Sequence, residues 1–183
     1  MIRVGILGVT GYAGIELLRL LCGHPEAKVT YLGTSSNAGT PISELYPNFK
    51  GICDMKLREV DIPKIAEECD LVFTSLPHGA SDKIIGELYN AGLKVIDLSG
   101  DYRYDDPAVY EKWYKTTHSN KELLKKSVYG MCELYREKIK KADLIGNPGC
   151  YTTASILGAA PLIKSGFVST DNIIIDAKSG VTG

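Results

Sequence analysis

Residues 2–14, which read IRVGILGVTGYAG, decide the fold. Residues 2–7 are a short apolar run typical of a buried strand, and residues 12–22 repeat leucine and isoleucine at helical spacing. The turn between them follows the pattern G-x-x-G-x-x-G, with glycines at Gly8, Gly11 and Gly14. Small residues there let the backbone approach a pyrophosphate, and the helix N-terminus adds amide protons and a positive dipole end. The turn therefore predicts a dinucleotide site, with a ligand-free tight turn as the alternative.

Apolar runs and helical patterns alternate along the rest of the chain. We expect strands over residues 28–32, 71–74, 95–98, 144–145 and 172–177, and helices over residues 81–91 and 150–163. Residues 101–126 are richer in charged and aromatic side chains, and we expect short helices and loops there, at the edge of a sheet. Strands that alternate with helices indicate parallel βαβ units, so we expect an α/β fold with a Rossmann-like doubly wound parallel sheet.

Composition and charge narrow the class of protein. The 183 residues are 44% hydrophobic and 23% charged, which is ordinary for a soluble globular chain. The net charge of −1 argues against a nucleic-acid partner held by charge, and the lysines at 138, 140 and 141 fit the polar face of a helix. No apolar stretch is long enough to cross a bilayer. We therefore expect no membrane partner. Five cysteines without a C-x-x-C pair argue against a disulfide framework or a metal site, and we expect a protein of the reducing cytoplasm.

The end of the second expected strand indicates which dinucleotide is bound. Folds that bind NAD usually place Asp or Glu there, for the ribose 2′-hydroxyl. Here residues 32–37 read LGTSSN and contain no acid. A carboxylate would repel a 2′-phosphate, whereas the hydroxyls of Ser35 and Ser36 can bond it. We therefore expect NADP rather than NAD, with an ordinary polar turn as the alternative.

A cysteine in residues 146–154, GNPGCYTTA, is the candidate nucleophile. Cys150 follows a strand and a Pro-Gly turn and opens a helix. Amides at a helix N-terminus stabilise a thiolate, which is the reactive form, and they can also hold an oxyanion on a bound carbonyl. The other cysteines are expected to be small buried core residues: Cys22, Cys53, Cys69 and Cys132.

Two further loops follow expected strands, where doubly wound folds bind ligands. Arg103 lies beyond the strand at 95–98 and suits a phosphate or carboxylate, unless it pairs with Asp101 or Asp105 on the surface. Pro77 and His78 follow the strand at 71–74 and are expected to face the cofactor. Among His24, His78 and His118, none is an obvious catalytic base.

Several motifs in order support a family resemblance. They are residues 8–14 (GVTGYAG), 75–79 (SLPHG), 96–99 (IDLS), 101–103 (DYR), 146–151 (GNPGCY) with Pro161 following, and 176–180 (DAKSG). With these motifs the chain resembles the N-acetyl-γ-glutamyl-phosphate reductases of arginine biosynthesis and, more distantly, the aspartate-semialdehyde dehydrogenases. The cysteine segment is the most specific of them.

The resemblance implies an activity: NADPH-dependent reduction of an acyl phosphate to a semialdehyde through a thioester on Cys150. It implies that Arg103 and Asn147 lie near the acyl phosphate. The expected cofactor contacts are Gly8, Thr10, Gly11, Tyr12, Ala13, Gly14, Ser35, Ser36, Pro77 and His78, together with Ser179 and Gly180 near the nicotinamide.

The resemblance also bears on domain organisation. We expect an NADP-binding domain over residues 1–148 and the start of an α+β substrate and dimerisation domain over residues 149–183. The chain is expected to end inside this second domain, with the catalytic histidine beyond Gly183 and a dimer or tetramer as the full-length state.

The sequence departs from the family pattern in places. The family often has proline where Thr152 stands, a basic residue near Asn37 and proline near Cys132. The missing basic residue weakens the case for a 2′-phosphate clamp. Two alternatives therefore stay open: a reductase for a lysine-pathway analogue, and a non-catalytic module that binds NADP(H).

Overall fold

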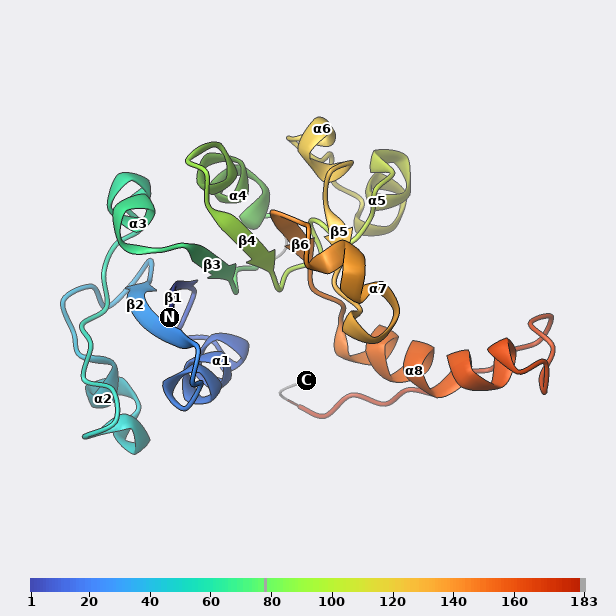
Figure 1. Ribbon diagram of the computed structural model, residues 1–183, viewed down its shortest axis with the longest axis horizontal. Coiled ribbons are helices and arrows are strands. Elements are labelled where there is room, and N and C mark those ends of the chain that lie inside the picture. Colours follow the sequence, from blue (N-terminus) through green and yellow to red (C-terminus); the bar gives the residue numbers. More distant parts are fainter. Residues whose placement is uncertain (78, 182–183) are drawn as a thin grey trace. The chain divides into compact units, whose positions relative to one another are not determined.

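A sheet of six parallel strands forms the first unit of the chain in the computed structural model (Figure 1). The strands are β1 (Ile2–Leu7), β2 (Ala27–Gly33), β3 (Leu71–Thr74), β4 (Lys94–Asp97), β5 (Val128–Tyr129) and β6 (Leu144–Gly146). They lie in the order β2–β1–β3–β4–β6–β5. The structure describes residues 1–77 and 79–181 and divides the chain into two compact units, Met1–Asn147 and Pro148–Gly183.

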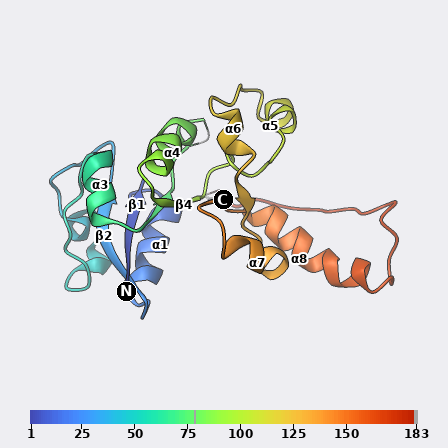
Figure 2. The ribbon, with the colours of Figure 1, turned by 45° about the horizontal axis from the view of Figure 1, so that its top comes forward.

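Helices cover both faces of the sheet. They are α1 (Tyr12–Cys22), α2 (Ile42–Leu45), the 3-10 helix η1 (Pro47–Phe49), α3 (Ile62–Glu68), α4 (Ser81–Asn90), α5 (Pro107–Tyr114), α6 (Lys121–Leu124) and α7 (Cys132–Ile139). The second unit contains α8 (Cys150–Lys164). Figures 1 and 2 show α3 and α4 on one face of the sheet and α1 on the other, as parallel strands buried on both faces require.

The core of the first unit has one apolar cluster on each face. In the first cluster Ile65 of α3 and Ile85 of α4 join Val72 of β3, and all three are fully buried. In the second, Leu18 of α1 joins Ile6 of β1. Burial of a side chain of this size contributes about 1.5–3 kcal/mol. The helices are therefore held to the sheet by apolar packing on both sides.

The order of the strands creates a switch point at β1. This strand pairs with β2 on one side and with β3 on the other. After β1 the chain first adds β2 on one side, and it then returns to add β3 and the later strands on the other side. Doubly wound sheets bind ligands in the crevice outside the carboxyl ends of the strands at such a point.

The predicted α/β fold with a doubly wound parallel sheet is confirmed. The predicted strands at 2–7 and 71–74 and the helix at 12–22 have the predicted bounds, and the other predicted elements before residue 165 differ by at most one residue at either end. Residues 101–126 hold two short helices, α5 and α6, as expected. The elements α2, η1, α3 and β5 were not predicted, because each is too short to show a clear period.

The predicted strand over residues 172–177 is wrong. Residues 173–180 have no regular secondary structure, and the side chain of Ile174 is 93% exposed. An extended apolar run becomes a strand only where a second strand satisfies its backbone groups. Among the described residues no strand pairs with this segment.

The expectation of buried cysteines holds for two of the four. Cys53 and Cys69 are buried, whereas Cys22 and Cys132 are exposed. Cys22 is the last residue of α1, whose buried positions are Gly14 and Leu18. Cys132 begins α7, a helix with no buried residue. A helix end away from the core therefore exposes a side chain whose type suggests burial.

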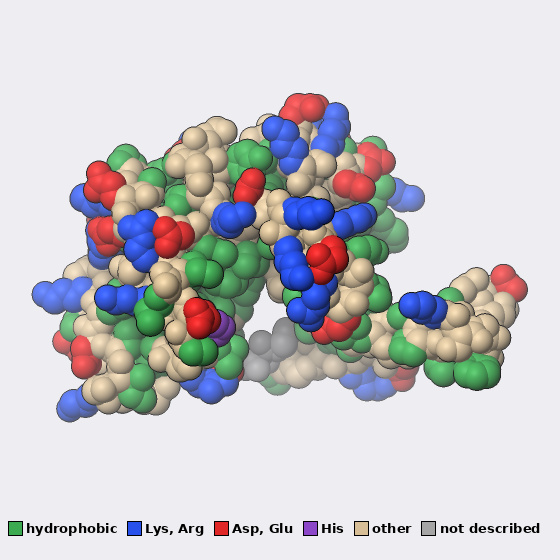
Figure 3. Space-filling model, viewed as in Figure 1, with side chains coloured by type: hydrophobic (Ala, Val, Ile, Leu, Met, Phe, Trp, Pro, Cys, Tyr) green, Lys and Arg blue, Asp and Glu red, His purple; other side chains and the backbone are tan. Residues whose placement is uncertain are grey.

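Charged side chains of both signs cover the outside of the first unit. Lys138 lies in α7 and Lys140 directly follows it, and Lys140 forms an ion pair with Glu137 at 2.8 Å. Figure 3 shows Lys and Arg side chains over this region with acidic side chains among them. Within the described residues, no helix combines the length and the apolar character needed to span a membrane.

Candidate functional site

Gly8, directly after β1, has a backbone conformation that favours glycine. Its φ is +77°, and a Cβ there would lie 2.2 Å from the backbone oxygen of Ser75. Its N–H donates to the oxygen of Gly33 at the end of β2, at 2.9 Å. L side chains rarely adopt a positive φ, and no side chain fits this space. Glycine therefore lets the ends of β1, β2 and β3 approach one another.

The other two glycines of the turn meet different demands. A Cβ at Gly14 would lie 2.4 Å from the oxygen of Gly8, so α1 packs onto the turn only without a side chain there. Gly11 is the N-cap of α1, with a φ of −80° and its nearest contact for a Cβ at 3.5 Å. Because Gly11 has no side chain to accept the first amide protons of α1, these amides are left for a ligand or solvent.

An open cleft of about 480 Å³ lies at the switch point between β1 and β3. It is lined by Gly8, Thr10, Gly11, Ala13, Ser35, Ser75, Leu76, Pro77, Leu98 and Ser99. Six of the predicted cofactor residues meet here: Gly8, Thr10, Gly11, Ala13, Ser35 and Pro77. No carboxylate is among the lining residues that the structure describes, and no Lys or Arg either. The cleft therefore has room for an anion on backbone amides and hydroxyls.

Four lining residues were missed by sequence reasoning. Ser75 and Leu76 follow β3, and Leu98 and Ser99 follow β4. The signal that identifies them is position, since each lies at or directly after the carboxyl end of a predicted strand. Their residue types alone carry no such signal.

The remaining predicted cofactor residues lie elsewhere or are not described. Tyr12 is 77% exposed, and Gly14 is buried behind the turn. Ser36 is exposed, and its Oγ accepts a hydrogen bond from Asn37 Nδ2 at 3.2 Å. His78 lies outside the described residues. Ser179 and Gly180 belong to the second unit, Pro148–Gly183.

The loop after β2 is shaped by a side chain that the sequence analysis did not single out. Thr34 is buried, and its Oγ1 accepts the N–H of Ser36 at 3.1 Å while donating to the Ser36 oxygen. A hydroxyl that bonds the backbone two residues ahead fixes a tight turn. The turn leaves the Ser35 side chain exposed on the rim of the cleft.

A buried acid supports the rim on the other side. Asp97 ends β4 and accepts hydrogen bonds from Thr74 Oγ1 at 2.8 Å, from the Ser99 N–H at 3.1 Å and from Ser99 Oγ at 2.6 Å. Burial raises the pKa of Asp97, and the bonds from Ser99 and Thr74 oppose that change. The carboxylate thus joins the ends of β3 and β4 behind the cleft wall.

Arg103 joins the ends of two strands through backbone oxygens. Its Nε donates to the oxygen of Asn147 at 2.8 Å, and one terminal nitrogen donates to the oxygen of Leu98 at 3.0 Å. The ion pair with Asp101 or Asp105 that the sequence left open does not occur among the described residues. The two predicted substrate residues, Arg103 and Asn147, are therefore neighbours at the carboxyl edge of the sheet.

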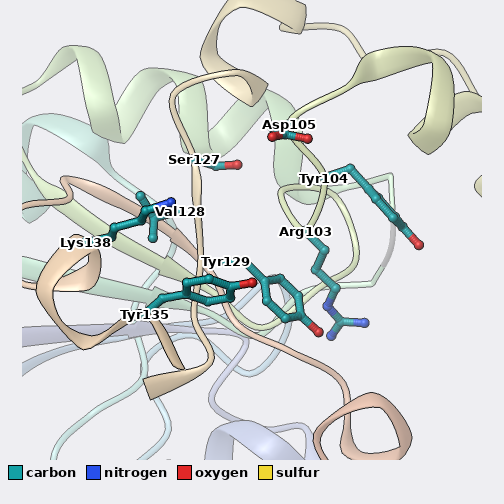
Figure 4. A pocket seen from close by; sticks show the side chains of 8 residues that line it. All are labelled: Arg103, Tyr104, Asp105, Ser127, Val128, Tyr129, Tyr135 and Lys138. Carbon is teal, nitrogen blue, oxygen red and sulfur yellow. The ribbon is translucent and has the colours of Figure 1, made fainter. Parts of the chain in front are cut away.

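Arg103 also lines a second cavity, of about 330 Å³. The other lining residues are Tyr104, Asp105, Ser127, Val128, Tyr129, Tyr135 and Lys138. Figure 4 shows the rings of Tyr129 and Tyr135 on the same side of this cavity as the Arg103 guanidinium, with Ser127 and Asp105 opposite. The cavity combines two cationic side chains, one carboxylate and three phenols, which suits a small polar molecule.

Cys150 is the first residue of α8, and its side chain is exposed. Gly149 is the N-cap and contributes no side-chain hydrogen bond. The hydroxyls of Thr152 and Thr153 both donate to the Gly149 oxygen, at 2.9 and 2.8 Å. This thiol therefore lies at the amide end of a helix of 15 residues, as the sequence predicted.

Comparisons with known proteins point to one group. Two family models match: the semialdehyde dehydrogenase NAD binding domain over residues 3–142, and the semialdehyde dehydrogenase dimerisation domain over residues 150–183. Curated relatives include N-acetyl-gamma-glutamyl-phosphate reductases of Halothermothrix orenii, 53% identical, and Acetivibrio thermocellus, 51% identical. Both matches cover all of this chain and 53% of the relative. The chain thus spans about half the length of these relatives.

Solved structures agree on the fold. Aspartate semialdehyde dehydrogenase with NADP from Candida albicans matches with a TM-score of 0.67 and 21% identity, over 90% of this chain and 47% of that one. Aspartate semialdehyde dehydrogenase II from Vibrio cholerae matches with a TM-score of 0.63 and 19% identity, with the same coverage. At this level of identity the likeness concerns the fold.

Proposed function

Because this chain belongs to the semialdehyde dehydrogenase family, we propose that its protein is an NADPH-dependent acyl-phosphate reductase. The substrate we propose is N-acetyl-γ-glutamyl phosphate, and the products are N-acetylglutamate 5-semialdehyde and phosphate. One observation carries this proposal: the chain is 53% identical, over all 183 residues, to a relative named for this reaction. We further propose that the enzyme acts in arginine biosynthesis in the cytoplasm and is a homo-oligomer.

The cleft at the switch point supports NADP as the cofactor. Gly8 and Gly14 allow the close backbone approach that forms the turn, and the first amides of α1 have no capping side chain, so they can bond an anionic group of the cofactor. Ser35 stands on a rim without a carboxylate, where an acid would repel a 2′-phosphate. We propose that Gly8, Thr10, Gly11, Ala13, Ser35 and Pro77 hold the cofactor, with Ser179 and Gly180 toward the nicotinamide. When bound, NADPH supplies the hydride for the reduction.

The chain's own residues carry the covalent steps. The thiolate of Cys150 attacks the acyl carbon, the bond from that carbon to the phosphate oxygen breaks, and phosphate leaves. After the reduction, the carbon–sulfur bond breaks, which releases the semialdehyde and restores the thiol. The free amides at the start of α8 stabilise charge that develops on the carbonyl oxygen. We place Arg103 and Asn147 near the phosphate that leaves.

The domain organisation we propose follows the sequence. Residues 1–148 form the NADP-binding domain, and residues 149–183 begin the domain for catalysis and dimerisation. The division of the chain after Asn147 supports this boundary. The match of the dimerisation model to residues 150–183 supports the homo-oligomer.

The test is the reverse reaction in the full-length protein: phosphate-dependent reduction of NADP⁺ with N-acetylglutamate semialdehyde, in the parent and in Cys150→Ala. We expect the parent to be active and the variant to lose at least about 10³-fold in kcat, because the nucleophile is gone. Cys132→Ala is the matched control, since Cys132 is also exposed and begins a helix. It should keep full activity.

Each other result selects an alternative. Activity that survives in Cys150→Ala removes this residue from the mechanism. An inactive parent that reduces NADP⁺ with the aminoadipate analogue is a lysine-pathway reductase. An inactive parent that binds NADP(H), and whose Cys150 reacts with iodoacetamide no faster than Cys132, is a non-catalytic binding module.

A further inference from the structure

A buried carboxylate lies behind the cleft and is not used by the steps above. Asp101 is fully buried in the loop after β4. Both of its oxygens accept the backbone N–H of Gly79, at 3.0 Å for Oδ1 and 2.9 Å for Oδ2. Gly79 lies in the loop after β3, two residues beyond Pro77, which lines the cleft. The carboxylate therefore ties the loop that forms one cleft wall to the loop after the next strand.

The position of the bond explains why a carboxylate suits this place. Gly79 has a φ of +78° and comes two residues before Ser81, the first residue of α4. The N-cap of α4 is Ala80, which has no side chain that can accept an amide proton. Negative charge near a helix N-terminus is stabilising, because the free amides there carry partial positive charge. Asp101 brings that charge from another loop.

Asp101 also reaches the second cleft wall and a helix. Its N–H donates to the Oγ of Ser99, a lining residue, at 3.1 Å. Its Oδ1 accepts the hydroxyl of Tyr110 from α5, at 3.0 Å. Burial raises the pKa of Tyr110, and the charge of Asp101 raises it further, so the phenol remains a donor. Asp101 thus joins the two cleft walls, after β3 and after β4, with α5 behind them.

A neutral apolar side chain could not replace these bonds. Charge-assisted hydrogen bonds are about twice as strong as neutral ones. Without the carboxylate, the Gly79 amide would lose its acceptor, and with it the bond that joins Gly79 to the loop after β4. A cleft assembled from separate loops depends on such ties for its shape.

From these contacts we infer that Asp101 is a positioning residue for NADP(H): by fixing the Gly79 amide it holds the Ser75–Pro77 wall in the arrangement that binds the cofactor. This inference rests on the proposed function of the cleft. Asp101 itself lies behind the wall and touches no cleft surface. Its effect therefore reaches the cofactor through the loop, and it falls on binding more than on turnover.

The experiment compares four variants in the full-length protein: Asp101→Ala, Asp101→Asn, Tyr110→Phe and Ile65→Ala. Fluorescence titration gives the Kd for NADPH, and hydrogen exchange of the segment from Ser75 to Ser81 reports on the loop directly. Circular dichroism ensures that each variant is folded at the temperature used. Steady-state rates separate KM for NADPH from kcat.

We expect Asp101→Ala to weaken NADPH binding at least about tenfold, with faster exchange of the segment and a smaller change in kcat. Asp101→Asn keeps the volume and one acceptor oxygen, so its Kd should lie between those of the parent and Asp101→Ala. Tyr110→Phe keeps the Gly79 bond and should bind NADPH within about threefold of the parent. Ile65→Ala destabilises the same core cluster from α3 and should leave the Kd within about twofold.

The inference is overturned if Asp101→Ala and Asp101→Asn bind NADPH within twofold of the parent. It is also overturned if Ile65→Ala weakens binding as much, because the effect would then be one of general stability. Should Asp101→Ala fail to fold, Asp101→Asn decides. A parent that does not bind NADPH refutes the proposed function instead. In that case, unchanged hydrogen exchange of the segment in Asp101→Asn would also show that the bond from Gly79 to Asp101 does not hold the loop.

Discussion

At the level of single residues, the three glycines of the turn after β1 are needed for different reasons. In the sequence the three glycines are equivalent members of one pattern. In the structure only glycine fits at Gly8 and Gly14, because neighbouring backbone atoms approach too closely for a Cβ, whereas Gly11 has room for a side chain. The cost of a substitution should therefore differ among positions that the pattern treats alike.

Gly8→Ala should cost clearly more stability than an alanine at another glycine with positive φ. The matched control is Gly39→Ala, because Gly39 has a φ of +88° and nothing within 4 Å of a Cβ. Gly39→Ala should lose about 1–2 kcal/mol from backbone strain alone. Gly8→Ala adds a clash with the Ser75 oxygen, so its loss should be larger and NADPH binding should fall with it.

Urea denaturation of both variants, with NADPH titration of each, makes the comparison. Equal losses of stability in the two variants would mean that the strand ends can separate to admit a methyl group. The close approach of β1 to β3 would then not be a requirement of the fold.

At the level of elements, one ion pair connects α3 to the segment beside β2. The two terminal nitrogens of Arg58 bond the two oxygens of Glu68, at 2.7 and 2.9 Å. The guanidinium also lies 4.1 Å from the centre of the Tyr31 ring. Arg58 pairs with Gly33 through an isolated bridge, so this contact holds α3 against the edge of the sheet. The bidentate geometry makes it stronger than an ordinary surface pair.

This pair should make stability depend on pH in acid. The hydrogen bond from Arg58 lowers the pKa of Glu68 below its ordinary value of 4.5. Because the pKa of Glu68 is lower in the folded than in the unfolded protein, its carboxylate stabilises the fold at any pH above the ordinary pKa. This stabilisation is lost as the pH falls through the pKa of the folded state. Glu68→Gln should therefore cost about 0.5–1 kcal/mol at pH 7, a figure reduced because both side chains are about one-third exposed.

Urea denaturation at pH 7 and near pH 3 tests this. The difference between parent and Glu68→Gln should shrink toward zero at the lower pH. Glu67→Gln is the control, since the Glu67 side chain forms no ion pair among the described residues and should show no such trend. A difference that stays constant with pH would point to packing rather than to charge.

At the level of the whole molecule, the two units differ in what they bury. The unit Met1–Asn147 contains both apolar clusters and every residue that lines the cleft. In the unit Pro148–Gly183, α8 has no buried residue, and Phe167 and Ile174 are 80% and 93% exposed. The buried apolar packing and the cleft thus lie in the first unit, and the second unit exposes apolar surface.

Residues 1–147 expressed alone should therefore fold, stay monomeric and bind NADPH. With NADPH at about 100 times its Kd, the free energy of unfolding should rise by about 2.7 kcal/mol. Residues 1–183 should associate at concentrations where 1–147 does not, because of the exposed apolar side chains. Thermal unfolding and light scattering measure the two effects.

The control is Gly8→Ala within residues 1–147, which should lose the rise in stability with NADPH. A fragment that shows no cooperative unfolding would contradict the division into units. If residues 1–147 associate to the same degree as residues 1–183, the surface responsible for self-association lies in the first unit.

The sequence alone determined the elements whose signals are local. The strand Ile2–Leu7, the turn and the helix Tyr12–Cys22 could be predicted with their bounds, because apolar period and glycine spacing act within a few residues. The placement of Cys150 at the start of a helix follows equally from a local Pro-Gly turn. For the same reason the doubly wound sheet could be predicted, since it follows from the order of such elements.

Only the tertiary structure decided which distant residues meet. The ends of β3 and β4 close the cleft opposite the glycine turn, and Asp101 reaches Gly79 across two loops. Pairing with a distant strand also decides which segments become strands. Val128 and Tyr129 form the short strand β5 because β6 pairs with them, whereas the apolar residues 173–175 have no such partner among the described residues and form no strand. A strand or a buried carboxylate is stabilised by partners far along the chain, whereas a helix start or a glycine turn is stabilised by its neighbours.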